Sequence, residues 1–421
     1  MTIMFKPLLN VTTPDKAIQL LKNHLNLETY KQKNRENINI KDALNRMLSK
    51  NIQTLINLPG FKRSTMDGYA VKAEDSFGAS DSLPSYLKMI GEIQMGCRPE
   101  FKIGLGETAK ISTGGMLPEG ANAVMMLEYT EQIDNTSIEV RKSVSPWENV
   151  VREDEDLKAG EIILKKGHKL RPQDIGALAG IGKANIEVYK KPKIAIISTG
   201  NEIIPIQNKP QIGQVRDINS YTLGTCVEEA QGIPIYKGII GDENYLLERK
   251  IREVIDKDKV EVVIISGGSS VGSRDITLEV LDKLGKPGIL VHGVSIKPGK
   301  PTIIAVTNNI PIFGLPGHPV SAMIIFDLFI RPLINWLQGS DYDYDSKKKI
   351  EATLISNVAS DPGREEYIRV FLYKKEGKFY AKPILGKSGL ISTMVQASGL
   401  IKIGLNIEGL ENGSKVAVRL F

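Results

Sequence analysis

The stretch 260–275 (VEVVIISGGSSVGSRD) has the composition of a phosphate-binding turn. The apolar, β-branched run Val262–Ile265 predicts a strand, and the residues after the turn predict a helix. Unpaired backbone N–H groups at the start of a helix, together with the helix dipole, attract an anion such as phosphate. The small residues that would approach it are Ser266, Gly267, Gly268, Ser269, Ser270 and Gly272. A plain strand-to-helix connection with capping serines has the same composition, so the turn alone supports both interpretations equally.

Two loops further along the chain combine proline with glycine. In 297–301 (KPGKP), proline fixes φ and glycine permits a tight turn, so Lys297 and Lys300 are held by a stiff backbone. This rigidity favours an anion site over a solvated surface turn. The second loop, 314–319 (GLPGHP), precedes a long apolar segment whose first helical turn suits Pro319. His318 has no partner acid nearby in the sequence, so the pattern does not favour a catalytic base there.

Three acids follow predicted strands or turns in the same region. Glu202 follows the strand 193–197, Asp242 stands at the predicted N-cap of the helix 243–255, and Asp275 follows the serine–glycine turn. Each has an ordinary explanation as a loop acid, a helix cap or a first-turn acid. Together at one sheet edge, their mutual repulsion would call for a cation. The pattern therefore predicts a site for Mg²⁺, which takes oxygen ligands and shares them with substrate phosphates.

The segments that must position these loops alternate between strands and helices. The expected strands cover 193–197, 234–240 and 261–265. The expected helices cover 219–230 (with Asn219 as the cap), 243–255 and 276–284. Extended segments at 289–291, 302–306 and 310–313 then precede a helix at 320–337. This alternation predicts βαβ units and a largely parallel sheet. Because ligands bind at the carboxyl ends of such strands, we expect the loops to converge there.

The flanks of this region have a different character. We expect amphipathic helices at 14–28 and at 41–48, many short strands between 59 and 144, and short strands separated by turns from 350 to the end. The predicted domains are a discontinuous helical and mixed domain (1–58 and 147–188), an inserted β domain (59–146), a doubly wound α/β domain (189–338) and a small C-terminal β-barrel (347–421).

Composition excludes several classes of protein. The chain has 421 residues, 41% of them hydrophobic and 25% charged, as expected for a soluble multidomain protein. Its two cysteines make no disulfide framework, and its four histidines lack the spacing of a zinc site. A net charge of +6 without a basic arm or an aromatic-interleaved stripe argues against nucleic acid. The apolar stretch 322–330 is too short to span a membrane, and the first residues lack signal-peptide character, so we expect a cytoplasmic protein.

Six motifs in order along the chain resemble the molybdopterin molybdenumtransferases, the MoeA family, which also includes the E domain of gephyrin. They are MDGYAV (66–71), STGG with LPEGANAV (112–124), STGNE (198–202), SGGSSVGSRD (266–275), KPGKP (297–301) and GLPGHPVSA (314–322). Several of these motifs are long, and they extend over nearly the whole chain. The resemblance implies the four domains above and an elongated homodimer whose active cleft is shared between protomers.

The resemblance also implies a reaction. Family members take adenylylated molybdopterin and molybdate, cleave the pyrophosphate bond, and release AMP and molybdenum cofactor with Mg²⁺ or a similar divalent ion. By motif, the serine–glycine turn with Pro316 and Pro319 would hold the pterin and nucleotide phosphates, and Asp275, Asp242 and Glu202 would hold the metal. The oxyanion site would contain Lys297, Lys300, Pro301, Arg364 and Ser388. Asp67 and Thr113 would act in the cleft of the other protomer, and Asp156 matches a family acid.

The chemistry of these residues suits molybdate, because a tetrahedral dianion is bound well by lysines, an arginine and backbone N–H groups. The sequence departs from the family at His318, where asparagine is usual, and this leaves the role of His318 open. Nothing in the sequence separates molybdate from tungstate. The adenylyltransferase of the same pathway is a further implied partner.

Two alternative functions share this fold. A molybdopterin adenylyltransferase would use the same α/β domain but would not require the MDGYA-bearing β module or the barrel. A non-catalytic scaffold would not require the acids and lysines of the cleft. The presence of all these features favours the molybdenum-inserting enzyme.

Overall fold

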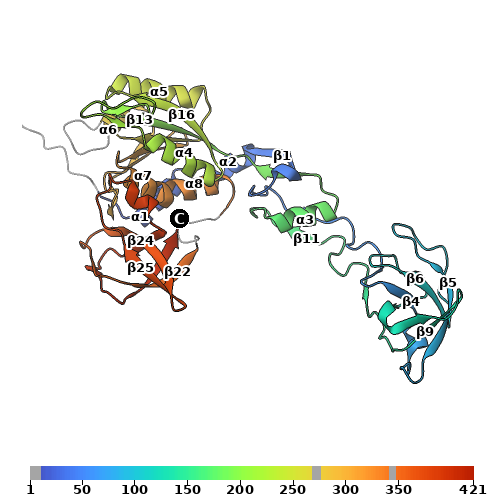
Figure 1. Ribbon diagram of the computed structural model, residues 1–421. Coiled ribbons are helices and arrows are strands. Elements are labelled where there is room, and N and C mark those ends of the chain that lie inside the picture. The colour runs from blue at the N-terminus through green and yellow to red at the C-terminus, as the bar shows by residue number, and fades with distance from the viewer. Residues whose placement is uncertain (1–10, 268–275, 341–347) are drawn as a thin grey trace, which may run out of the picture. The chain divides into compact units, whose positions relative to one another are not determined.

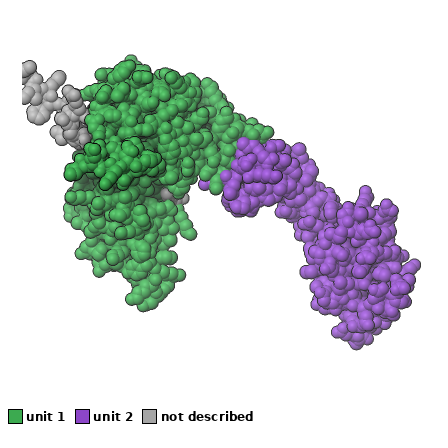
Figure 2. Space-filling view, turned by 45° about the horizontal axis from the view of Figure 1, so that its top comes forward, with its two compact units in different colours: residues 1–37, 45–49, 187–421 green, residues 38–44, 50–186 purple. Residues whose placement is uncertain are grey.

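The computed structural model describes residues 11–267, 276–340 and 348–421. It separates into two compact units, shown in green and purple in Figure 2. Unit 1 contains Met1–Asn37, Asn45–Ser49 and Glu187–Phe421, and unit 2 contains Ile38–Leu44 and Lys50–Ile186. Each unit is described by itself.

Unit 1 contains the predicted α/β domain, built on a six-stranded sheet (Figure 1). In sheet order its strands are β16 (Ile233–Ile240), β13 (Lys193–Thr199), β17 (Val262–Ser266), β21 (Ile310–Leu315), β20 (Ile303–Thr307) and β18 (Pro287–His292). The first four are parallel, as predicted, but β20 is antiparallel to both of its neighbours. The reason is the turn between β20 and β21, where Asn308 and Asn309 have φ of 52° and 67°. Two consecutive residues with positive φ form the tight turn of a β-hairpin, so the chain reverses without a helix.

The central strands are apolar on both faces, so helices cover both sides of the sheet. Ile194 and Ile196 of β13 pack toward α4 (Asn219–Glu229) and the helices α7 (Pro319–Ile325) and α8 (Arg331–Leu337). Ala195 and Ile197 pack on the other side with α5 (Asn244–Asp256) and α6 (Ile276–Lys283). Figure 1 shows α5 and α4 on opposite sides of the sheet. This arrangement confirms the doubly wound fold predicted from sequence.

Several local predictions were wrong. Asn219 and Asp242 do not cap helices, because Ile218 and Glu243 occupy the N-cap positions and both polar side chains bond to neighbouring loops. The helix expected at 14–28 is two helices, α1 (Pro14–Asn23) and α2 (Leu27–Lys33), since the Asn26 side chain accepts from the N–H of Thr29 and starts a new helix. The helix expected at 41–48 is absent: only the short 3₁₀ turn η1 (Ile40–Asp42) forms in that segment.

The segment Pro319–Leu337 is helical throughout, with a π-helical stretch, η4 (Phe326–Ile330), between α7 and α8. Pro319 is its first residue, as predicted, with His318 at the N-cap. Among the described residues, this is the one helix long and apolar enough to cross a membrane. Its most apolar window is 89% buried inside the protein, so its apolar side chains form part of the core of unit 1.

The C-terminal strands close into the predicted barrel. Its strands are β24 (Glu365–Lys375), β25 (Lys378–Pro383), β22 (Lys349–Leu354), β28 (Lys415–Leu420) and β26 (Gly399–Ile403). Each pairs with the next, and β26 pairs back with β24 to complete the ring. The short strand β19 (Ile296–Lys297) adds to β24 in parallel, so the segment that contains Lys297 is hydrogen-bonded to the barrel.

Unit 2 contains a six-stranded sheet of its own and a smaller region around one helix. In sheet order, the strands are β7 (Ala123–Met126), β4 (Gly68–Val71), β6 (Glu107–Ile111), β5 (Ser85–Glu92), β9 (Ser137–Val140) and β8 (Thr130–Gln132). The predicted β domain therefore has a sheet with the MDGYAV motif on a central strand. The smaller region contains α3 (Pro172–Gly180) and the paired strands β2 (Ile52–Gln53) and β11 (Ile162–Leu164).

The start of α3 is held by a buried carboxylate, Asp174. It accepts hydrogen bonds from Arg171 N at 2.8 Å and Arg171 Nε at 3.0 Å, and lies 2.7 Å from His168 Nε2. The hydrogen bonds from Arg171 hold the pKa of the Asp174 carboxyl well below its usual range. The folded-state pKa is therefore below the unfolded one, so the stabilisation is complete above the unfolded pKa of about 3.9 and is lost as the pH falls below it.

We expect Asp174→Asn to lower the local stability of α3 by about 1–2 kcal/mol at pH 7, because the amide oxygen can still accept a hydrogen bond but lacks the negative charge that favours the helix N-terminus and Arg171. The deficit relative to wild type should shrink as the pH falls from 5 toward 3. Hydrogen exchange of the α3 amides in both proteins measures this difference. A deficit that is the same at pH 7 and pH 3 would show that the carboxylate charge is not what stabilises the helix.

Candidate active site

A cavity of about 440 Å³ lies at the carboxyl ends of the parallel strands of unit 1. The loops that follow β13, β17 and β21 all contribute to its wall, as is typical of binding sites in open α/β sheets. Its lining residues are Glu202, Ile203, Val215, Arg216, Asp217, Ile218, Asn219, Gly267, Pro301, Pro316, Gly317, His318, Pro319 and Gly389. The structure therefore brings the start of the serine–glycine turn, the end of the KPGKP loop and the GLPGHP loop to one cavity.

The serine–glycine and GLPGHP loops approach each other closely at their glycines. Gly267 has φ of 104°, and a Cβ atom on it would lie 2.0 Å from the carbonyl oxygen of Thr199. Only glycine fits this position, so the turn begins with backbone packed against backbone. The N–H of Gly267 donates to Leu315 O at 3.1 Å, which fixes one loop against the other.

Asn219 connects these two loops to α4. Its Nδ2 donates to Ser266 Oγ at 2.6 Å and to Gly317 O at 2.8 Å. Its Oδ1 is buried and has no hydrogen-bond partner among the described residues. Because a buried acceptor without a partner costs free energy, this oxygen in the cavity wall is available to a donor on a ligand or to a metal-bound water.

The predicted metal-binding acids are placed unequally. Glu202 is exposed and lines the cavity. Asp242 is not a lining residue. Its carboxylate accepts hydrogen bonds from Thr199 Oγ1 at 3.2 Å and from Asn201 N at 3.4 Å, in the turn that also contains Glu202. Asp275 lies outside the described residues, as do Gly268, Ser269, Ser270 and Gly272. No cluster of three possible metal ligands occurs in the described part of the chain, so the predicted magnesium site stays a prediction.

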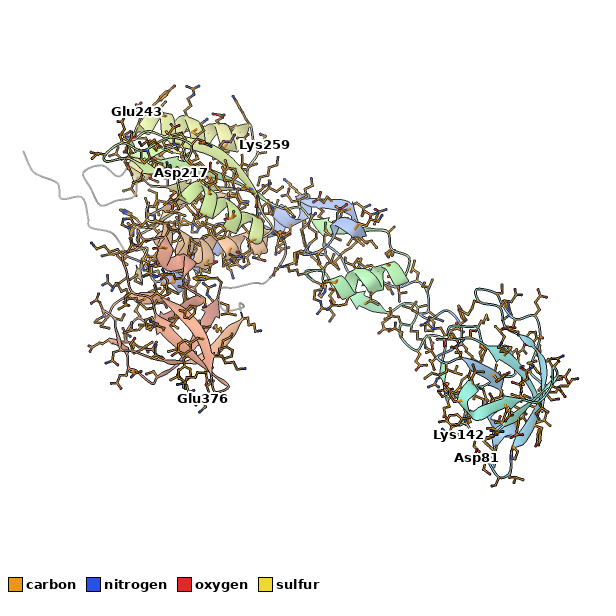
Figure 3. The ribbon with its side chains drawn as sticks, viewed as in Figure 1. Asp81, Lys142, Asp217, Glu243, Lys259 and Glu376 are labelled. Atoms are coloured by element: carbon orange, nitrogen blue, oxygen red, sulfur yellow. The ribbon has the colours of Figure 1, made fainter. Side chains whose placement is uncertain are left out.

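Asp217 is a carboxylate in the cavity wall that the sequence analysis missed. It is 6% exposed, and it accepts hydrogen bonds from Ser198 Oγ and Ser220 N, both at 3.0 Å. Figure 3 shows it beside the start of α4, while Glu243 stands at the start of α5. The missed signal is the sequence Asp217-Ile218-Asn219-Ser220, in which only Asn219 was given a role, as a helix cap.

Arg216 is a second residue that the sequence analysis missed. Its side chain lines the cavity, and Nε donates to the carbonyl oxygen of Asn208 at 3.1 Å. This bond fixes the guanidinium group, and no ion pair holds it among the described residues. The cavity wall thus has an arginine available for an anion as well as the carboxylates of Glu202 and Asp217.

Of the predicted oxyanion residues, Pro301 lines the cavity, while Lys297 and Arg364 form a group beside the barrel. The Nζ atom of Lys297 lies 2.9 Å from Glu366 Oε1 and 3.6 Å from Asp361 Oδ2, and Asp361 is also paired with Arg364. The Arg364 guanidinium, and after it Lys297, lowers the pKa of the Asp361 carboxyl below its usual value. The structure thus brings Lys297 and Arg364 together around Asp361. Lys300 is exposed and forms no ion pair within the described ranges.

Ser388, from the barrel, meets the GLPGHP loop. Ser388 Oγ lies 2.8 Å from His318 Nδ1, and Ser388 O accepts from Val320 N at 3.2 Å. The next residue, Gly389, lines the cavity. Two hydrogen bonds therefore attach a barrel loop to the start of α7 at the edge of the cavity.

Asp67 and Thr113 lie in unit 2 and contact each other. Asp67 Oδ1 accepts from Thr113 N at 2.7 Å, which links the start of β4 to the loop after β6. Asp156 also lies in unit 2, where its N–H donates to Leu58 O at 3.0 Å. The structure thus brings the MDGYAV and STGG motifs together. Their action in the cleft of another protomer stays a prediction.

The loops, acids and cations of unit 1 define an α/β protein with a cavity at the carboxyl edge of its sheet. Three family models match successive parts of the chain: the MoeA N-terminal region (domain I and II) at residues 12–182, a "Probable molybdopterin binding domain" at 195–336, and the MoeA C-terminal region (domain IV) at 351–421. The chain belongs to the MoeA family, as its motifs predicted.

Individual proteins of this family are similar to the chain over most of their length. The chain is 36% identical to a molybdopterin biosynthesis protein of Methanocaldococcus jannaschii, covering 91% of each chain. It is 31% identical to the molybdopterin molybdenumtransferase of Bacillus subtilis, covering 93% of this chain and 90% of that one. A crystal structure of a MoeA protein from Pyrococcus horikoshii is similar with a TM-score of 0.81 and 36% identity, covering 98% of this chain and 99% of the other. These relatives confirm the predicted fold class and the prediction that the chain is an enzyme of this transferase class.

Proposed function

We propose that this protein inserts molybdenum into molybdopterin, converting adenylylated molybdopterin and molybdate to molybdenum cofactor and AMP. The observation that supports this most strongly is the cavity that joins Gly267, Pro301 and the GLPGHP loop at one sheet edge. A cavity of about 440 Å³ suits a ligand of nucleotide or pterin size. The chemistry needed is the cleavage of a phosphoanhydride beside an oxyanion, which cations and backbone N–H groups promote by stabilising developing charge.

Each predicted residue has a role in this proposal. The serine–glycine turn with Pro316 and Pro319 holds the phosphates, while Lys297, Lys300, Pro301, Arg364 and Ser388 surround molybdate or tungstate. The Asn219 Oδ1 atom, which is buried without a described partner, accepts a hydrogen bond from the substrate. Asp67 and Thr113 act from the second protomer of a homodimer. The adenylyltransferase of the same pathway supplies the substrate.

Glu202, Asp242 and Asp275 would hold a divalent cation, Mg²⁺ or a similar ion. The described residues fit this role in part: Glu202 and Asp217 offer hard carboxylate oxygens at the cavity, and Asp242 lies beside the same turn. When bound, the ion would neutralise charge on the phosphoanhydride. The chain's own groups would orient the phosphates and exclude water.

The test adds purified adenylylated molybdopterin to the protein with Mg²⁺ and measures AMP release with molybdate, with tungstate and with neither. We expect AMP release that depends on the oxyanion. Asp275→Asn should abolish it while the protein remains folded and dimeric. AMP release that ignores both oxyanions would contradict the proposal.

The same preparation separates the alternatives. Formation of an AMP adduct from molybdopterin, ATP and Mg²⁺ without molybdate would favour the adenylyltransferase. Unchanged cofactor synthesis in Asp275→Asn, with dimerisation intact, would favour a scaffold whose acids have no catalytic role.

A further inference from the structure

His318 lies where three features of unit 1 meet. It occupies the N-cap of α7, its side chain lines the cavity, and its Nδ1 atom is 2.8 Å from Ser388 Oγ of the barrel loop. The ring also lies close to Gly389, since a Cβ atom on that glycine would be 3.6 Å from His318 Cδ2 and 3.9 Å from Nε2. A barrel loop with glycine at this position can therefore pack against the imidazole.

The bond between His318 and Ser388 limits where protons can be. A neutral imidazole has one N–H, and a serine hydroxyl has one proton. If Nδ1–H donates to Ser388 Oγ, the hydroxyl proton is free and Nε2 presents a lone pair. If the hydroxyl donates to Nδ1, then Nε2 has the proton. With a neutral ring, only one of the two residues offers a proton to a third group.

The lining of the cavity decides between these arrangements. His318 lines it, whereas Ser388 does not. Ser388 is also held by its backbone, because its carbonyl oxygen accepts from Val320 N at 3.2 Å. An anion in the cavity therefore meets the imidazole, and it favours the tautomer in which Nε2 donates. No described residue forms a hydrogen bond with Nε2, so that position is available to a ligand.

We propose that His318 binds an oxyanion of the substrate through Nε2–H, and that Ser388 fixes the required tautomer by donating to Nδ1. Arg216 lines the same cavity and adds a fixed positive charge, while Glu202 and Asp217 make the rest of the charged wall. This rests on the proposed function and deepens it. It makes His318 a ligand-binding residue and changes Ser388 from a direct oxyanion ligand to a positioning residue.

The direct test observes the imidazole nitrogens by NMR in protein labelled with ¹⁵N-histidine. The chain has four histidines, and His318→Phe identifies the resonances of His318 by their loss. We expect a protonated Nε2 and an accepting Nδ1, with the Nε2 resonance moving on addition of AMP or of molybdate. The two additions distinguish a phosphate from a molybdate oxyanion. His168, whose Nε2 contacts Asp174 in unit 2, is an internal control that should not move.

Affinity provides the second measurement, by calorimetric titration of AMP and of molybdate into each variant. His318→Phe keeps the ring volume and should weaken binding of the relevant anion at least tenfold, the effect of losing a hydrogen bond to a charged group. His318→Gln places an N–H near the Nε2 position and should recover part of the affinity. Ser388→Ala should cost less than His318→Phe.

Four outcomes would overturn the inference. Unchanged affinity in His318→Phe, or a larger loss in Ser388→Ala than in His318→Phe, would make Ser388 the direct ligand and leave the proposed function intact. A complex in which Nδ1 is protonated and Nε2 is not would do the same. Wild-type protein that binds neither AMP nor molybdate would remove the proposed function as well.

Discussion

Lys300→Ala is expected to lower the rate of molybdenum cofactor formation about 100- to 1000-fold, the usual cost of removing one donor from an oxyanion site. Lys297 and Arg364 already have carboxylate partners in Asp361 and Glu366, whereas Lys300 is exposed without an ion pair in the part of the chain that the structure describes. Its charge is therefore the one most available to a dianion. AMP release with saturating adenylylated molybdopterin and a molybdate titration measures the effect.

Lys286→Ala is the matched control for Lys300. Lys286 is also an exposed loop lysine, but it precedes β18, where Pro287 pairs with Thr307 at the other end of the strands from the cavity. This variant should retain wild-type activity. A Lys300→Ala enzyme with normal activity and normal dependence on molybdate would exclude Lys300 from the oxyanion site.

Asp327→Asn is expected to destabilise unit 1 by about 3–5 kcal/mol, because it leaves two buried arginines without their shared carboxylate. Asp327 is 7% exposed; its Oδ1 accepts from Arg331 Nε at 2.7 Å and its Oδ2 from Arg419 Nη2 at 2.8 Å. Arg331 lies one helical turn away and Arg419 lies on β28, so the same carboxylate attaches the core helix to the barrel. Urea unfolding followed by Trp336 fluorescence in a Trp147→Phe background measures the change.

Glu229→Gln serves as the control for this buried network. Glu229 pairs with the same Arg331 at 2.7 Å, but its side chain is 58% exposed. Solvent weakens such a pair, so the expected loss is below about 1 kcal/mol. Equal losses in the two variants would show that burial of Asp327 contributes nothing beyond an ordinary ion pair.

The helices and strands were predictable wherever the pattern of apolar residues in the sequence matches the faces that are buried in the fold. β13 and β17 are apolar on both faces because helices cover both faces, and the sequence shows this as continuous β-branched runs. The helix at 41–48 was predicted wrongly. Its apolar residues Met47 and Leu48 are buried, but they lie in an extended segment whose backbone pairs with residues 188–189, and not on the buried face of a helix. Periodicity alone does not distinguish these two ways of burying a side chain.

The candidate site was predictable as a set of loops but not as a set of contacts. Glycine and proline motifs identified the backbone that surrounds the cavity, since their conformational limits are local. Asp217 and Arg216 were missed because their position in the wall depends on the start of α4. The pairing of Lys297 with Glu366 depends on β19 joining β24, which is a long-range pairing with no local signal.

The sequence by itself determined the family, the order of the domains, and the turns whose glycines and prolines allow few backbone conformations. These properties follow from residues close together in the chain. Only the tertiary structure decided which polar atoms are satisfied and which face the cavity: Asn219 binds two loops and does not cap a helix, and His318 meets a serine 70 residues away. Hydrogen bonds act over about 3 Å, so their partners are set by packing, which separation along the chain does not specify.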